Sequence, residues 1–96
     1  MLEKDIENRY VKECKKLGFR AEKFKMSGKR GGADRIVFLP GGYTLFIEFK
    51  KPSGKPSPHQ VEFLNQMSSL GFPGLITDNV EVALTFTKKV YNEKNK

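Results

Sequence analysis

Apolar residues recur at helical spacing along the first part of the chain, residues 2 to 17. The apolar positions, three or four apart, are Leu2, Ile6, Tyr10, Cys14 and Leu17. This period places them on one face of an α-helix. Gly18 follows at once, and glycine commonly ends a helix because it tolerates a left-handed backbone. We therefore predict an amphipathic helix over residues 2 to 17.

Three stretches after this helix have the pattern of β-strands. Residues 19 to 25, "FRAEKFK", alternate apolar and polar side chains, and a basic, glycine-rich loop, "MSGKRGG", follows them. Residues 33 to 39, "ADRIVFL", and 43 to 50, "YTLFIEFK", are rich in β-branched and aromatic residues and flank the turn sequence "PGG". Such a pair predicts a β-hairpin.

A second helix is predicted after the turn-rich segment "KPSGKPSP". Ser57 suits the N-cap, Pro58 the first helical position, and Gln60 the third position of a capping box. The stripe expected to be buried is Val61, Leu64, Met67 and Leu70, with Gly71 ending the helix. Residues 73 to 77, "PGLIT", are expected to form a short buried strand.

The segment after residue 78 fits two patterns. Val80, Val82, Leu84 and Phe86 alternate as in a strand, whereas Val80, Ala83, Thr87 and Val90 have helical spacing. Asp78 with Glu81 resembles a capping box, which favours the helix. The predicted order is α-β-β-β-α-β-α, an α/β fold with a mixed sheet flanked by helices and a C-terminal helix.

Size and composition narrow the class of protein. The 96 residues suit a single domain, 1–96. No stretch approaches the ~20 apolar residues of a membrane span, and the charged N-terminus does not resemble a signal peptide. The single cysteine, Cys14, makes no internal disulfide, so a reducing cytoplasm is expected.

The charge balance points to a polyanionic partner. Eighteen basic and eleven acidic residues give a formal net charge of +7. Such an excess favours nucleic acid, although a cationic surface kept for solubility would give the same count.

Two carboxylates and an amine interrupt the predicted hairpin. Side chains alternate along a strand, so Phe46, Glu48 and Lys50 share one face. Asp34 begins one hairpin strand near the point where Lys50 ends the other, so Asp34 and Glu48 are expected at one edge of the sheet. Close carboxylates repel each other, and Mg²⁺ relieves the conflict while leaving positions for water and phosphate oxygens. The alternative is an ordinary strand start and an exposed Glu–Lys ladder, since this spacing is common.

The context of these residues resembles the VRR-NUC branch of the PD-(D/E)XK nuclease superfamily. The matching stretches are "IENRYVKECKKLGF", "GGADRIVFLPGG", "LFIEFKKPSGKPSPHQ" and "GFPGLIT", which cover nearly the whole chain. The resemblance implies the restriction-endonuclease-like α-β-β-β-α-β core. It also implies a nuclease that uses Mg²⁺ or Mn²⁺.

The resemblance implies a role for each matching residue. Asp34 and Glu48 correspond to metal-binding acids, Lys50 to the catalytic lysine, and the Phe49 backbone carbonyl to a further metal ligand. Glu7 suits the helix-borne acid of the family, with Glu3 as the alternative; a first-turn acid is also favoured by the helix dipole. Where the family has proline before the aspartate, this chain has Ala33.

Other polar residues have two interpretations. Gln60 is a capping partner for Ser57, and in the resemblance it also faces the active site. His59 and Cys14 are more simply an incidental surface histidine and a small core residue. The residues expected to hold phosphates are those of the two basic loops, Lys29, Arg30, Lys51 and Lys55.

The function that these patterns favour is a metal-dependent DNA endonuclease. A small chain without a separate specificity domain is expected to recognise DNA shape, such as a Holliday junction or flap. The small resolvases of this superfamily act as homodimers, and a two-fold dimer would place two sites on one junction. A compact stand-alone copy also suggests a phage origin. The alternatives are a non-catalytic nucleic-acid-binding module of the same fold and a basic structural protein of a ribonucleoprotein.

Overall fold

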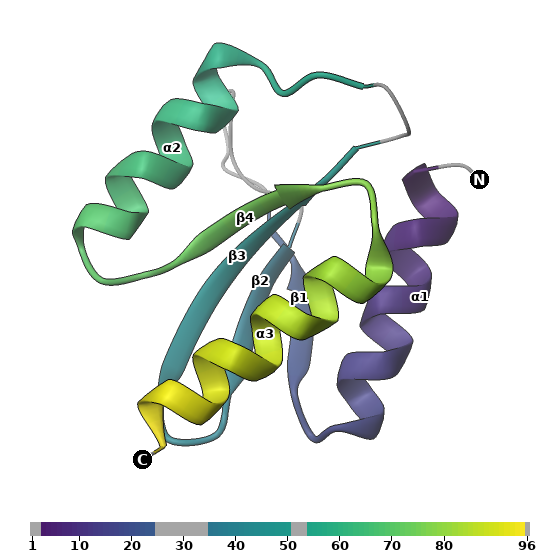
Figure 1. The fold of residues 1–96 in the computed structure, drawn as a ribbon, viewed down its shortest axis with the longest axis vertical. Helices are drawn as coiled ribbons and strands as arrows, with labels where there is room; N and C mark the ends of the chain where they lie inside the picture. The colour runs from purple at the N-terminus through teal and green to yellow at the C-terminus, as the bar shows by residue number, and fades with distance from the viewer. Residues whose placement is uncertain (1–2, 25–34, 51–53, 96) are drawn as a thin grey trace.

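The structure is a computed structural model that describes residues 3–24, 35–50 and 54–95. Within these ranges the chain forms three helices and four strands in the predicted order (Figure 1). The elements are α1 (Glu3–Lys16), β1 (Arg20–Lys23), β2 (Arg35–Leu39), β3 (Tyr43–Phe49), α2 (Pro58–Ser69), β4 (Gly74–Thr77) and α3 (Val80–Lys94). The helix interpretation of the last segment is confirmed.

The four strands form one mixed sheet in the order β1-β2-β3-β4. The first three strands are antiparallel neighbours, and β4 runs parallel to β3. The β2–β3 turn contains Gly41 and Gly42, both at positive φ, as a tight hairpin requires. A parallel pair cannot be joined by a hairpin, so the chain crosses from β3 to β4 through α2.

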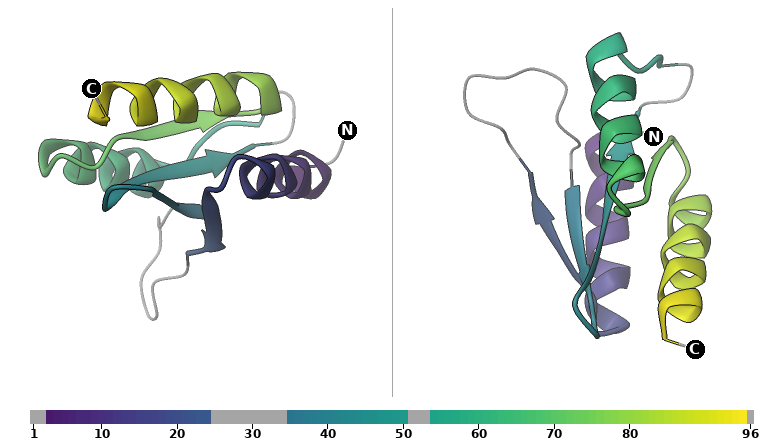
Figure 2. Two further views of the ribbon diagram at one scale, coloured as in Figure 1. Left: turned by 90° about the horizontal axis from the view of Figure 1, so that it is seen from below. Right: turned by 90° about the vertical axis from the view of Figure 1, so that its left-hand side faces the viewer.

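Helices α1 and α3 pack together on one face of the sheet (Figures 1 and 2). This core contains the alternate residues of β3, namely Leu45, Ile47 and Phe49, all fully buried. The Tyr10 hydroxyl lies 2.6 Å from the Thr87 hydroxyl, so the two helices share a buried polar contact. Burial raises the pKa of Tyr10 and that of the Cys14 thiol, so both side chains remain neutral core groups.

Helix α2 covers part of the opposite face. Three aromatic rings pack there with centroid separations of 5.3 to 5.7 Å. They are those of Phe24, which directly follows β1, Phe46 of β3 and Phe63 of α2. The predicted α2 stripe was partly wrong, because Val61 and Leu70 are exposed while Leu64 is buried. The helix turns its Phe63–Leu64–Met67 side to the sheet, since the aromatic rings occupy that face.

Two further local predictions need correction. Strand β4 is half-buried along its length because it lies at the edge of the sheet. The N-cap of α3 is Asn79, whose side chain accepts a hydrogen bond from the Val82 N–H, so Asp78 is not the capping residue. The predicted helical stripe of α3 is confirmed by its buried residues, which include Val80, Ala83, Thr87 and Val90.

None of the helices in the described part of the chain combines the length and apolar character needed to span a bilayer.

Candidate active site

Glu48 is a carboxylate in β3, the most buried of the strands that the structure describes. It occupies the sixth position of β3, and its side chain is 1% exposed. Ile47 and Phe49 face the core under α1 and α3, so the alternation of the strand directs Glu48 to the face that carries α2. The predicted placement of Glu48 and Phe46 on a common face is therefore confirmed.

Two side chains reach the same oxygen of Glu48. The Gln60 amide Nε2 donates a hydrogen bond to Oε1 over 2.6 Å, and the Lys50 ammonium lies 3.3 Å from that atom. Lys50 is 18% exposed, so its ammonium stands between the buried carboxylate and solvent. Both neighbours are donors, and they therefore match an ionised carboxylate.

The start of α2 fixes the direction in which Gln60 presents its amide. The Gln60 N–H donates to Ser57 Oγ over 3.2 Å, and the Ser57 N–H donates to Gln60 Oε1 over 2.9 Å, which is a complete capping box. Because the amide oxygen accepts from Ser57, the NH₂ group is the part turned to Glu48. The two interpretations of Gln60 are thus satisfied by one side chain.

Replacing the cap should therefore affect more than the helix. We expect Ser57→Ala to lower the free energy of unfolding by about 1 kcal/mol through loss of the N-cap. For the nuclease that the sequence resemblance implies, DNA cleavage should also slow by roughly tenfold, because removing a group that orients a metal ligand has an effect of that size. Thermal unfolding and a cleavage assay measure the two effects.

Asn79→Ala is the matched control for the cap variant. Asn79 caps α3 with the same kind of side-chain bond, but it lies outside the Glu48 contacts. It should lose similar stability and retain its cleavage rate. Equal activity losses in the two variants would show that general destabilisation explains the effect.

Glu7 has a different environment from the other predicted site residues. Its Oε1 accepts a hydrogen bond from Arg35 Nε over 2.6 Å, and the two side chains are 14% and 13% exposed. Arg35 begins β2, where it pairs with Ile47 of β3. Since Ile47 faces α1, this ion pair lies on the sheet face opposite the Glu48 side chain. No role for Arg35 was predicted from the sequence; its signal was a cation at the head of the apolar run "RIVFL".

The remaining predicted site residues are distributed as follows. Phe49 is buried and ends β3, and Lys55 is exposed in the segment that precedes α2. Four residues lie outside the described ranges: Lys29, Arg30, Asp34 and Lys51. In the described part of the chain, no three His, Cys, Asp or Glu side chains are grouped so as to hold a metal ion.

The oxygen donors at the end of β3 nevertheless have the chemistry that Mg²⁺ and Mn²⁺ prefer. Glu48 supplies a carboxylate held in place by Lys50 and Gln60, and the Phe49 carbonyl is the next backbone oxygen along the strand. These groups fit part of a hard-cation site.

Comparison with known proteins is consistent with this arrangement. The chain is 37% identical over 81 residues to "Putative nuclease p44" of Acyrthosiphon pisum secondary endosymbiont phage 1, covering 84% of this chain and 87% of that protein. A solved structure described as a VRR_NUC domain superposes with a TM-score of 0.80, at 23% identity, over 90% of this chain and 94% of the other. No family model matches the sequence.

Proposed function

We propose that this chain, which belongs to the VRR-NUC family of nucleases, is a metal-dependent endonuclease. It would hydrolyse phosphodiester bonds in DNA. The observation that carries the proposal is the buried Glu48 carboxylate with Lys50 and Gln60 on one oxygen. A carboxylate buried in a central strand is costly unless it is paired, so a fold without catalytic use for Glu48 would favour an apolar residue there.

Asp34 supplies the second carboxylate in this proposal. Arg35 pairs with Ile47 in the β2–β3 ladder. Asp34 directly precedes Arg35 in the sequence, and Glu48 directly follows Ile47. Glu7 stays paired with Arg35 in this proposal, and the Phe49 carbonyl is the third candidate ligand. A Mg²⁺ or Mn²⁺ ion bound by these groups would activate a water molecule and offset the charge on the scissile phosphate.

The protein's own side chains orient this chemistry. Gln60 holds the Glu48 carboxylate in one direction, and Ser57 holds Gln60. Lys50 is a compact cation at the solvent edge of the site, where its N–H groups can donate to a phosphate oxygen or to the attacking water. Lys29, Arg30, Lys51 and Lys55 are proposed to hold phosphates on either side of the scissile bond.

The proposed substrate is branched DNA, and the proposed working unit is a homodimer. The net charge of +7 favours contacts with backbone phosphates, which position a nucleic acid without reading its base sequence. Two-fold symmetry in the protein would match two-fold character in a Holliday junction.

The test is a cleavage assay with labelled four-way junction, flap and linear duplex. Each substrate is incubated with Mg²⁺, with Mn²⁺ and with chelator. We expect cleavage with either metal, none with chelator, and faster cleavage of a branched substrate than of linear duplex. Binding without cleavage under every metal would replace the nuclease with a non-catalytic nucleic-acid-binding module.

A further inference from the structure

A hollow of about 440 Å³ lies beside α1 at the end of the sheet that carries Glu48. It is lined by Lys4, Glu7, Asn8, Lys23 and Arg35. Strands β1 and β3 finish at this end of the sheet, and β2 begins there. Because Arg35 shares the sheet face of its partner Ile47, the hollow and the Glu48 side chain lie on opposite faces of one sheet end.

The lining carries an excess of positive charge. Among the described residues that line it, Glu7 is the one carboxylate, and it is paired with Arg35 over 2.6 Å. Lys4 and Lys23 are exposed at the rim. The Arg35 Nε–H is used by Glu7, and a guanidinium carries four further N–H donors on its terminal nitrogens. The hollow therefore combines two lysine ammonium groups, a guanidinium and the Asn8 amide.

The strand register brings two of these positive charges together, which destabilises the folded protein when no anion is bound. Lys23 and Arg35 are directly opposed in the β1–β2 ladder. Like charges at opposed positions destabilise a sheet, and Glu7 compensates for one of the two. An anion in the hollow would offset the remaining charge.

We propose that this hollow binds a backbone phosphate of the nucleic acid, on the far side of the sheet end from the scissile bond. The inference rests on the proposed function in that the bound polymer is nucleic acid. A strand that crosses the sheet end with one phosphate beside Glu48 and Lys50 meets the hollow on the other face. The site adds Lys4, Lys23 and Arg35 to the phosphate contacts and positions the strand without reading its bases.

The test measures binding separately from cleavage. The full chain is titrated against labelled duplex in chelator, and the dissociation constant is measured from about 50 to about 200 mM salt. For the variant with Lys4→Ala and Lys23→Ala, the slope of log affinity against log salt should fall by about 0.9, the value for one phosphate contact. The factor by which the dissociation constant rises from about 50 to about 200 mM salt should be about 3.5-fold smaller for this variant than for the unaltered chain.

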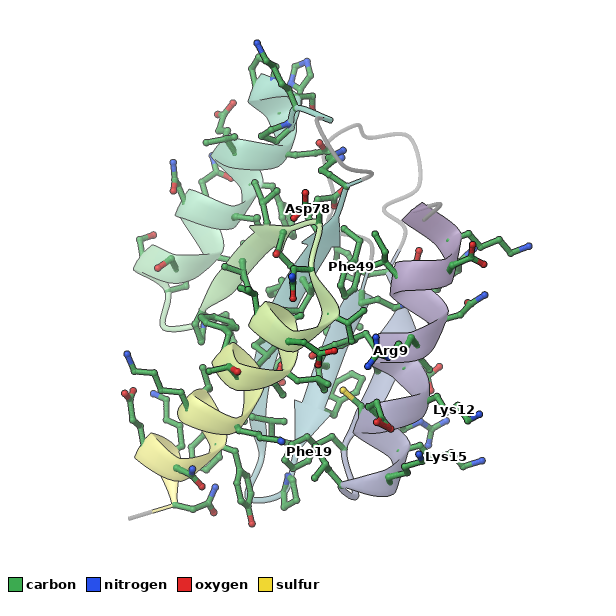
Figure 3. All side chains as sticks on the ribbon, turned by 45° about the vertical axis from the view of Figure 1, so that its right-hand side comes forward. Arg9, Lys12, Lys15, Phe19, Phe49 and Asp78 are labelled. Carbon is green, nitrogen blue, oxygen red and sulfur yellow. The ribbon has the colours of Figure 1, made fainter. Side chains whose placement is uncertain are left out.

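The matched control removes two exposed lysines nearer the C-terminal end of α1 that do not line the hollow, Lys12→Ala and Lys15→Ala. Both side chains are exposed and point away from the sheet (Figure 3). This control changes the net charge by the same amount, so it corrects for long-range attraction. Equal slopes in the two double variants would overturn the proposed phosphate site.

Two other results separate this site from its alternatives. Inorganic phosphate alone, added at constant ionic strength, can be followed through the amide NMR signals of Asn8 and Lys23. Shifts at these amides combined with an unchanged DNA slope would assign the hollow to free phosphate and overturn the proposal. A changed slope in a chain that never cleaves DNA would support the phosphate site while rejecting the nuclease, so the two proposals fail independently.

Discussion

Lys50→Ala is expected to reduce DNA cleavage by about 10²–10⁴-fold, the usual range for loss of a positioned proton donor or charge-stabilising group. The Lys50 ammonium is 3.3 Å from the Glu48 carboxylate and 18% exposed, so it can contact both the carboxylate and a phosphate. The dissociation constant for DNA, measured in chelator, should change by no more than the loss of one phosphate contact would cause. Single-turnover cleavage at saturating enzyme separates the rate effect from binding.

Lys88→Ala is the control for this variant. Lys88 is an exposed lysine on α3, outside the contacts of Glu48, and its removal changes the net charge equally. Its cleavage rate should stay within about twofold of the unaltered chain, as expected for a surface substitution away from the chemistry. A Lys50→Ala protein that cleaves as fast as this control would remove the lysine from the mechanism.

Glu48→Gln is expected to abolish metal-dependent cleavage and to weaken Mn²⁺ binding by on the order of 10²-fold or more. Loss of a ligating carboxylate should exceed the roughly 10–100-fold cost of removing groups that merely orient ligands. DNA binding in chelator should hold or improve, because a negative charge near the phosphates has gone. Calorimetric titration with Mn²⁺ and anisotropy with labelled DNA measure the two effects.

Substitution at Glu48 also removes the carboxylate with which Lys50 is paired, so folding must be checked in the same samples. The side-chain amide introduced by Glu48→Gln would keep an oxygen for the Gln60 NH₂ group, which limits the damage to the α2 contact. A folded variant with undiminished Mn²⁺ affinity would assign Glu48 a structural role.

Asp34→Asn should reproduce the loss of metal binding if Asp34 supplies the second carboxylate.

Several features of this protein could be predicted from short-range sequence patterns. The capping box of Ser57 and Gln60 spans three residues, so its hydrogen bonds depend on local backbone geometry and residue type. The common face of Glu48 and Lys50 follows from the two-residue period of a strand. The order of helices and strands is equally a consequence of local periodicity, and it was correct in the described parts of the chain.

Contacts between distant segments depended on the tertiary structure. Gln60 reaches Glu48 from twelve residues away because α2 packs on that face of β3, and Arg35 holds Glu7 across 28 positions because α1 packs on the other. Neither contact follows from local periodicity, which fixes the face of a residue within its own element. The side of α2 that is buried was decided in the same way, by the aromatic rings of Phe24 and Phe46. Sequence thus determined which groups could do chemistry, and the packing of all elements together decided which of those groups meet.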